Sequence, residues 1–267
     1  MKMVETISAL STGISQLAEQ LFGDDTKGSL RFTSQLLAMC AKAQDKDFLL
    51  VHNPGGWGTT HLENLLQWER SIVSGAGATL DRLGYTYSLI QYFRTGSGWS
   101  ERMGDIKEQY HFFASKAKVM AAGLSFITQY YTDIKVVLVG ASLGAAFTNA
   151  VSQHVAGLER VFSIELGIPF PYKSRRVITK NTLVVDSNGL MPDALMEWNV
   201  PVIIKAYLVA PFRWTKYLLQ GKRMKFTYCT NIPGHDYNWD YPEVQQQIET
   251  FLSLNFGNTS NLEVETP

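Results

Sequence analysis

The chain has 267 residues, 45% of them hydrophobic and 18% charged, and its 24 basic and 24 acidic residues leave no formal net charge. A chain of this length and composition can bury one substantial core, so a single globular domain is expected. The balance of charge excludes the broad electrostatic attraction on which nucleic-acid binding depends. The two cysteines, Cys40 and Cys229, lie far apart in apolar surroundings. This arrangement predicts reduced thiols and a cytoplasmic protein.

Residues 1–45 predict a helical segment that packs on the core. Apolar residues recur there at spacings of three and four, at Ile7, Leu10, Ile14, Leu17 and Leu21. This spacing is typical of an amphipathic helix over residues 3–22, and a second helix is expected over 30–43. No apolar stretch is long enough for a signal peptide or a membrane span, so neither is predicted.

The first predicted strand, Phe48–Val51, runs into a glycine-rich turn that reads His52-Asn53-Pro54-Gly55-Gly56-Trp57-Gly58. Backbone N–H groups in such a turn can face a developing negative charge without interference from side chains, as an oxyanion hole requires. We therefore predict that Gly55, Gly56 and Trp57 contribute donors to an oxyanion hole.

Strands and helices then alternate along the chain. A helix is expected over 60–83, a strand over 85–93, a solvated loop at 94–99 that includes Arg94, and a helix over 105–131. Further strands are expected at 135–139, 161–164, 182–185 and 225–229, before a last helix that begins near Val244. This order predicts an α/β fold with a mostly parallel sheet flanked by helices.

A serine lies between two glycines immediately after the predicted strand Lys135–Val139, in Gly140-Ala141-Ser142-Leu143-Gly144. A strand that turns sharply into a helix forces the serine into a strained conformation, and side chains at the two glycine positions would collide with the neighbouring strand and helix. The pattern is typical of a nucleophile elbow. Ser142 is the candidate nucleophile, and Leu143 would supply a further oxyanion donor.

A histidine follows in Ile232-Pro233-Gly234-His235-Asp236-Tyr237, between the predicted strand at 225–229 and the last helix. A loop in this position can bring His235 over the sheet edge to meet Ser142. His235 is therefore the candidate general base.

These three motifs together resemble the α/β-hydrolase superfamily over roughly residues 46–256, with Ser142 first and His235 last in the order serine, acid, histidine. The resemblance implies a Ser-His-acid triad and hydrolysis of an ester or related acyl bond. It leaves the substrate open, because one fold hosts many chemistries. The helical segment 1–45 is an addition to this domain, and 257–267 is expected to be a flexible tail.

The acid departs from the family pattern, in which an aspartate often lies four residues before a proline after the penultimate strand. Counting back from Pro192 reaches Asn188. Asp186, at the strand end, is the favoured acid. Asp193 and Glu165 are alternatives, and the absence of an acid is also open.

Between Trp198 and His235 the sequence has no acidic residue but many basic and apolar ones. A sheet-covering helix interrupted by Pro211 is the favoured interpretation of residues 198–222. The alternative is a lid or a peripheral membrane surface through 200–222, because a basic amphipathic stretch suits a lipid interface.

The leading hypothesis is a serine hydrolase that cleaves a carboxylic ester, thioester or lipid ester through an acyl-enzyme. Its expected partner is a small acyl substrate, without nucleic acid. No cofactor or metal is predicted, because His61, His111 and His154 lack metal-ligand spacing. Acyl transfer by the same triad and a non-catalytic ligand-binding protein of the same fold are the alternatives.

Overall fold

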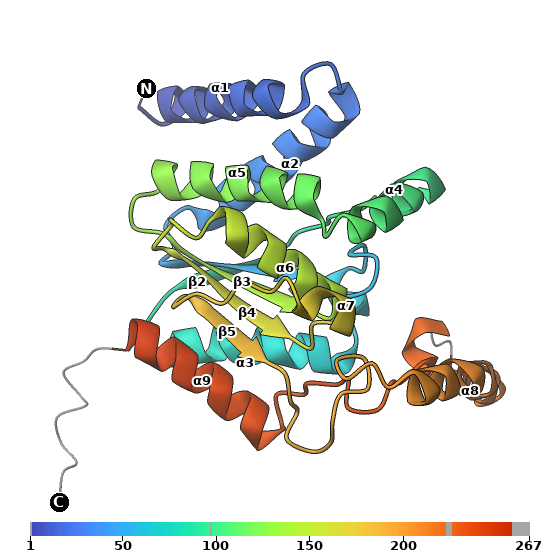
Figure 1. Cartoon of the computed structure of the whole chain (residues 1–267). Helices are drawn as coiled ribbons and strands as arrows, with labels where there is room; N and C mark the ends of the chain where they lie inside the picture. Colours follow the sequence, from blue (N-terminus) through green and yellow to red (C-terminus); the bar gives the residue numbers. More distant parts are fainter. Residues whose placement is uncertain (1, 97, 223–225, 258–267) are drawn as a thin grey trace, which may run out of the picture.

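The computed structural model of the chain describes residues 2–96, 98–222 and 226–257. Its centre is a five-stranded sheet in which all neighbouring strands are parallel, in the order β2-β1-β3-β4-β5 (Figure 1). The strands are β1 (Phe48–Asn53), β2 (Tyr87–Gln91), β3 (Lys135–Ala141), β4 (Val161–Leu166) and β5 (Thr182–Val185). The predicted α/β fold with a parallel sheet and flanking helices is confirmed.

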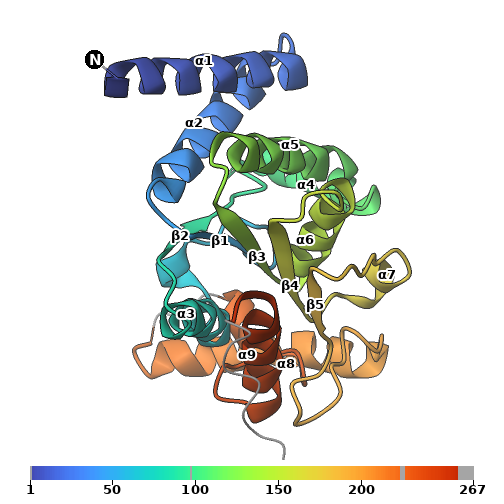
Figure 2. The same ribbon diagram turned by 90° about the vertical axis from the view of Figure 1, so that its left-hand side faces the viewer.

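Helices cover both faces of the sheet (Figures 1 and 2). One face carries α5 (Ala114–Tyr130), α6 (Leu143–His154) and the N-terminal pair α1 (Lys2–Phe22) and α2 (Thr26–Ala43). The other face carries α3 (Gln67–Arg82) and α9 (Pro242–Phe256). The remaining elements are α4 (Trp99–Tyr110), α7 (Phe170–Lys173), α8 (Val200–Leu219) and the short 3-10 helices η1 (Leu62–Asn64) and η2 (Phe226–Cys229).

The central strands β1, β3 and β4 are mostly apolar because both of their faces are buried, whereas the outer strands β2 and β5 are largely half-buried. Successive side chains of a strand point to opposite faces, so Leu49 and Val51 of β1 pack in one core cluster with α2 and α5. Phe48 and Leu50 of the same strand pack in the other cluster with α3 and α9. The helices on both faces therefore fix the central strands, and with them the loops at the strand ends.

The expected helix over 105–131 is instead two helices, α4 and α5, separated at residues 111–113. Phe112 and Phe113 have positive φ angles of 56° and 60°, which end the helical path. Phe113 is fully buried and stacks against Tyr172, so core packing of its ring overrides the local preference for one continuous helix.

Three other predictions about the chain path differ from the structure or fall outside it. Residues 226–229 of the expected strand at 225–229 form η2, which packs against α8 and adds no strand to the sheet. The helix α8 continues through Pro211 without interruption. Residues 223–225 and the tail from residue 258 lie outside the described residues. Within the described part of the chain, no helix is both long enough and apolar enough to cross a membrane.

Candidate active site

Ser142 occupies the sharp turn between β3 and α6. Its φ and ψ angles of 54° and −122° belong to a region that L-residues rarely adopt. The turn is held on both sides: the amide of Ser142 donates to Leu166 O at 2.9 Å, and its carbonyl accepts from the amides of Ala145 and Ala146. The strand β4 and the first turn of α6 therefore hold the serine in this strained conformation.

The two glycines that flank Ser142 leave no room for a side chain. A Cβ atom on Gly140 would lie 2.5 Å from Thr148 Oγ1, and one on Gly144 would lie 2.0 Å from the carbonyl oxygen of Asn53. Real Cβ atoms do not approach other heavy atoms this closely. The steric reason predicted for glycine at both positions is confirmed.

The loop that carries His235 brings it to Asp193. His235 Nδ1 lies 2.7 Å from Asp193 Oδ2, and the hydroxyl of Tyr237 donates to the same oxygen at 2.7 Å. The other oxygen, Oδ1, accepts from the amides of Leu195 and Met196 at 2.8 and 3.3 Å. The side chain of Asp193 is fully buried. A carboxylate with this many donors orients the imidazole ring and favours Nδ1 protonation.

The environment of Asp193 favours its charged form. Burial by itself raises the pKa of Asp193, but the hydrogen bond and charge of His235, with the hydrogen bonds from Tyr237 and the Met196 amide, hold that pKa below its ordinary value. Asp193 is therefore ionised at neutral pH.

Asp186, the acid favoured from the sequence, is directed elsewhere. Its two carboxylate oxygens accept from Arg176 Nη1 and Nη2 at 2.7 and 2.9 Å in a bidentate pair. Of the candidate acids, the structure pairs the alternative Asp193 with His235 and not the favoured Asp186, because the loop after β5 continues past Asp186 before it reaches His235. Asp186 therefore pairs with Arg176, and Asp193, seven residues later in the chain, lies beside His235.

Glu165 and Asn188 also have other partners. Glu165 is fully buried on β4, where Asn149 Nδ2 donates to both of its oxygens, and burial raises the pKa of Glu165 to about 8. Asn188 Nδ2 donates to the carbonyls of Gly234 and Asp236 at 3.3 and 3.0 Å. The side-chain amide of Asn188 thus ties the loop after β5 to the histidine loop.

The second imidazole nitrogen of His235, Nε2, makes no hydrogen bond within the part of the chain that the structure describes. This nitrogen is buried. The edges of the rings of Trp68 and Tyr237 pack near the imidazole, with ring centroids 6.4 and 6.1 Å away. Packing and the Asp193 contact therefore fix the ring while leaving one nitrogen able to exchange a proton.

Ser142 and His235 belong to the same edge of the sheet, at the carboxyl ends of the strands. The amide of Ser142 is hydrogen-bonded to Leu166, the last residue of β4. A Cβ on the next residue, Gly167, would lie 2.6 Å from the ring of Tyr237. Tyr237 in turn donates to Asp193, the partner of His235. Ligand sites of open α/β sheets form at this edge.

The glycine-rich turn after β1 lies against the elbow. A Cβ on Gly55 would lie 2.9 Å from Glu69 Oε1, 3.1 Å from Ala141 O and 3.6 Å from Ser142 Cβ, so the turn packs closely against the elbow. Trp57 is 39% exposed, and Gly56 has a φ of 54°. Leu143, the first residue of α6, presents an amide that has no acceptor within its own helix, as at any helix start.

Arg94 holds this turn from behind. Its Nη1 donates to the carbonyl of Pro54 at 2.8 Å, and its Nη2 donates to the carbonyl of Gly56. A trans peptide points its N–H away from its C=O. The carbonyls of Pro54 and Gly56 share peptide units with the amides of Gly55 and Trp57, so Arg94 sets the direction of both amides.

The expectation of a solvated loop at 94–99 is wrong for its first residues, because Arg94 is only 4% exposed, whereas Trp99 is exposed. Its guanidinium lies over the ring of Phe113 at 5.3 Å, and its Nε lies 3.8 Å from Asp105 Oδ2. Burial lowers the pKa of Arg94 to about 10, and Asp105 opposes that decrease, so the cation persists at neutral pH. Nothing in the local sequence marks Arg94, since its partners come from three distant segments.

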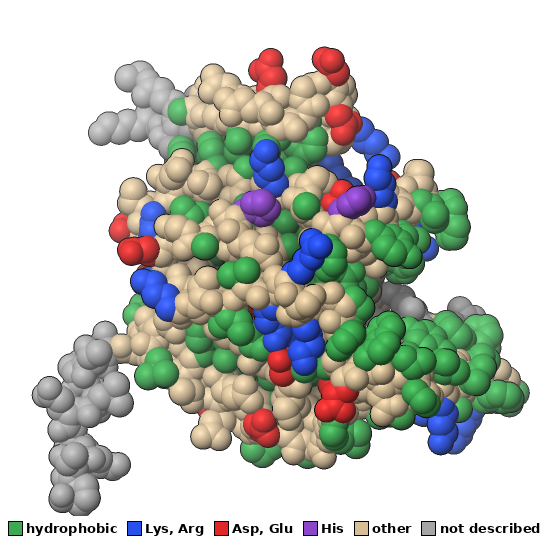
Figure 3. All heavy atoms as spheres, in the orientation of Figure 1, with side chains coloured by type: hydrophobic (Ala, Val, Ile, Leu, Met, Phe, Trp, Pro, Cys, Tyr) green, Lys and Arg blue, Asp and Glu red, His purple; other side chains and the backbone are tan. Residues whose placement is uncertain are grey.

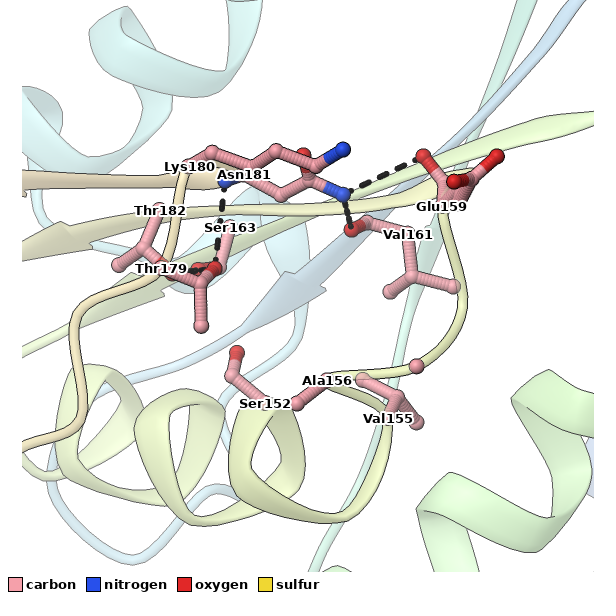
Figure 4. Close-up of a pocket in the computed structure, with 11 residues that line it drawn as sticks. Ser152, Val155, Ala156, Glu159, Val161, Ser163, Thr179, Lys180, Asn181 and Thr182 are labelled. Atoms are coloured by element: carbon pink, nitrogen blue, oxygen red, sulfur yellow. Dashed lines mark hydrogen bonds between the residues drawn. The ribbon is translucent and has the colours of Figure 1, made fainter.

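A separate cavity of about 200 Å³ lies at the opposite edge of the sheet, near the amino ends of β4 and β5 (Figure 4). Its lining includes Ser163 and Asn181. The side-chain amide of Asn181, through Nδ2, donates to the carbonyls of Glu159 and Val161, so its donors are already used within the protein. This cavity is distinct from the edge that carries Ser142.

Comparison with known proteins gives a distant likeness to solved structures. No protein-family model and no curated protein matches the chain. Among solved structures, the chain is similar to a Trichoderma reesei cutinase in complex with a C11Y4 phosphonate inhibitor. The match covers 92% of this chain and 91% of that one, with a TM-score of 0.48 and 14% sequence identity.

Proposed function

We propose that the protein is a serine hydrolase that cleaves a carboxylic ester, a thioester or a lipid ester. The observation that carries this proposal is the pairing of His235 Nδ1 with the buried carboxylate of Asp193 at 2.7 Å, at the sheet edge where Ser142 sits in a strained elbow. Among the described residues, His235 Nε2 has no hydrogen-bond partner. A base oriented by an acid and a nucleophile held in a turn are the parts that acyl transfer requires.

In the proposed reaction, Ser142 Oγ attacks the acyl carbonyl carbon while His235 Nε2 accepts the hydroxyl proton. Asp193 stabilises the imidazolium that results. The tetrahedral intermediate collapses, the bond to the leaving alcohol breaks, and His235 returns the proton to that alcohol. Water then attacks the acyl-enzyme with His235 again as the base, and the carboxylic acid and free Ser142 are released.

The negative charge on the intermediate would be met by backbone amides. The amide of Leu143 is available at the start of α6, and Arg94 orients the amides of Gly55 and Trp57 away from itself. The amide of Gly56 belongs to the same turn. Each well-placed donor contributes about 3 kcal/mol to such an intermediate. Arg94 is then a positioning residue, because it acts through the turn and not on the substrate.

Labelling with a fluorophosphonate probe tests the proposal, because the probe reacts only with an activated serine. We expect wild-type protein to be labelled, and Ser142→Ala and His235→Ala proteins to remain unlabelled. Hydrolysis of p-nitrophenyl esters should depend on the same two residues. Absence of labelling in correctly folded wild-type protein, or labelling that survives Ser142→Ala, would reject the proposed nucleophile.

A further inference from the structure

The helix α8 stands apart from the sheet and exposes apolar side chains. It packs against η2, and among its residues only Ala206 and Ala210 are buried (Figures 1 and 2). Phe212 is 77% exposed, Leu219 is 85% exposed and Leu208 is 66% exposed. Its other exposed large apolar side chains are Val200, Ile204, Tyr207, Trp214 and Leu218. Most of α8 therefore does not act as the sheet-covering helix that the sequence favoured.

The exposed apolar side chains form one continuous face. At about 100° per residue, the small buried residues Ala206 and Ala210 lie on the inner side of the helix, and Ile204, Leu208 and Phe212 follow one another on the outer side. Figure 3 shows hydrophobic side chains gathered over the region of α8, with basic side chains along one border. An exposed apolar face of this extent marks an interaction surface.

Basic residues flank this face, and acidic ones are absent from the segment. Lys205 and Lys216 are both exposed, and their spacing places them about 20° apart around the helix, next to Leu208 and Phe212. The sequence between Trp198 and His235 contains no aspartate or glutamate. A partner with an apolar interior and a negatively charged surface would complement both features.

The face is connected to the candidate site at the N-terminal end of α8. The helix starts just after the loop of Asp193, and that loop is tied to the histidine loop by the bond from the Ala194 amide to Pro233 O at 3.1 Å. The exposed ring of Trp198 precedes the helix and stacks on the exposed ring of Phe170, with centroids 5.7 Å apart. Exposed aromatic rings therefore extend the apolar face toward the edge of the sheet that carries Ser142.

We propose that α8 docks the protein on the surface of an anionic lipid bilayer. The outer face of the helix, represented by Phe212 and Leu219, enters the boundary between headgroups and acyl chains, while Lys205 and Lys216 contact the anionic headgroups. A second copy of the chain fits less well, because antiparallel packing of two α8 helices would bring Lys205 of one copy close to Lys216 of the other.

Vesicle co-sedimentation of the full-length chain tests this proposal. The protein carries Ser142→Ala, so that binding is measured without turnover and does not depend on the proposed reaction. One vesicle population is phosphatidylcholine alone, and the other contains equal amounts of phosphatidylcholine and phosphatidylglycerol. We expect binding to the mixed vesicles, weakening as salt is raised, and little binding to phosphatidylcholine alone.

Two double variants separate the apolar and the electrostatic contributions. Lys205→Gln with Lys216→Gln should weaken binding to the mixed vesicles about 30-fold at low salt. Phe212→Ser with Leu219→Ser should abolish binding. These side chains are exposed, so the thermal unfolding of both variants should match that of the parent.

A control carries one change of each kind on other helices. Lys118→Gln with Leu254→Ser alters an exposed lysine of α5 and an exposed leucine of α9, and should bind like the parent. Failure of the parent protein to bind mixed vesicles at low salt would overturn the proposal, as would equal loss in the control. A concentration-dependent dimer that Phe212→Ser with Leu219→Ser disrupts, without vesicle binding by the parent, would assign the face to a second copy instead.

Discussion

Replacement of Asp193 by asparagine tests the assignment of the acid most directly. The change keeps the size of the side chain but removes the negative charge 2.7 Å from His235 Nδ1. At an effective dielectric constant of about 20, a full charge pair at this separation is worth about 6 kcal/mol. This energy corresponds to about four powers of ten in rate if all of it is used in the transition state. The asparagine amide can also favour the wrong imidazole tautomer, and the same change in a serine-protease triad lowers kcat by about 10⁴.

The assay is ester hydrolysis by purified Asp193→Asn, with kcat and KM measured separately. We expect kcat to fall by about 10³ to 10⁴ with little change in KM, because the acid acts after the substrate is bound. The rate of fluorophosphonate labelling should fall in parallel.

Asp186→Asn is the matched control, because it removes a carboxylate from the same loop. The Asp186 carboxylate pairs with the buried Arg176 and not with His235. The activity of the folded variant should therefore stay within about threefold of wild type. If Asp186→Asn loses activity by orders of magnitude while Asp193→Asn stays within about tenfold of wild type, the reasoning from the hydrogen bonds fails.

Three further predictions concern the elbow, the turn that Arg94 holds and a buried carboxyl. Gly144→Ala should lower the free energy of unfolding by about 2 kcal/mol or more in denaturant titrations, because the new Cβ would lie 2.0 Å from a backbone oxygen. Gly157→Ala, where the new Cβ would enter open space, should change the free energy of unfolding little. Arg94→Met should misplace the amides proposed to stabilise the oxyanion. Because those amides act only in the transition state, kcat should fall about 100-fold with KM nearly constant. A change confined to KM would contradict the positioning role of Arg94. Burial raises the pKa of Glu165 from 4.5 to about 8, so the folded protein favours the neutral carboxyl. The stability of the fold from this group is fully present below about pH 4.5 and is lost as the pH rises toward 8. Glu165→Gln should therefore abolish that part of the pH dependence of thermal unfolding, and an unchanged dependence would show that Glu165 does not cause it.

The local sequence was sufficient for those features that depend on neighbouring residues along the chain. Apolar runs of strand length predicted the five strands, because parallel strands are buried on both faces and leave no polar alternation. The glycines around Ser142 predicted the elbow, because the steric demands of a strand-to-helix turn act within a few residues. The pattern at 225–229 failed, since an apolar run does not specify whether it pairs with a sheet edge or packs, as η2 does, on a helix.

The sequence by itself determined the parallel α/β architecture, the strained position of Ser142 and the candidacy of His235, because each depends on short-range sterics or on apolar patterning. Only the tertiary structure decided that Asp193, and not Asp186, meets His235, because the path of the loop depends on contacts with distant segments such as Arg176. It also decided that Arg94 is buried behind the glycine-rich turn and that the apolar face of α8 lies outward. Hydrogen bonds and packing between residues far apart in the chain set these positions, and no local pattern records them.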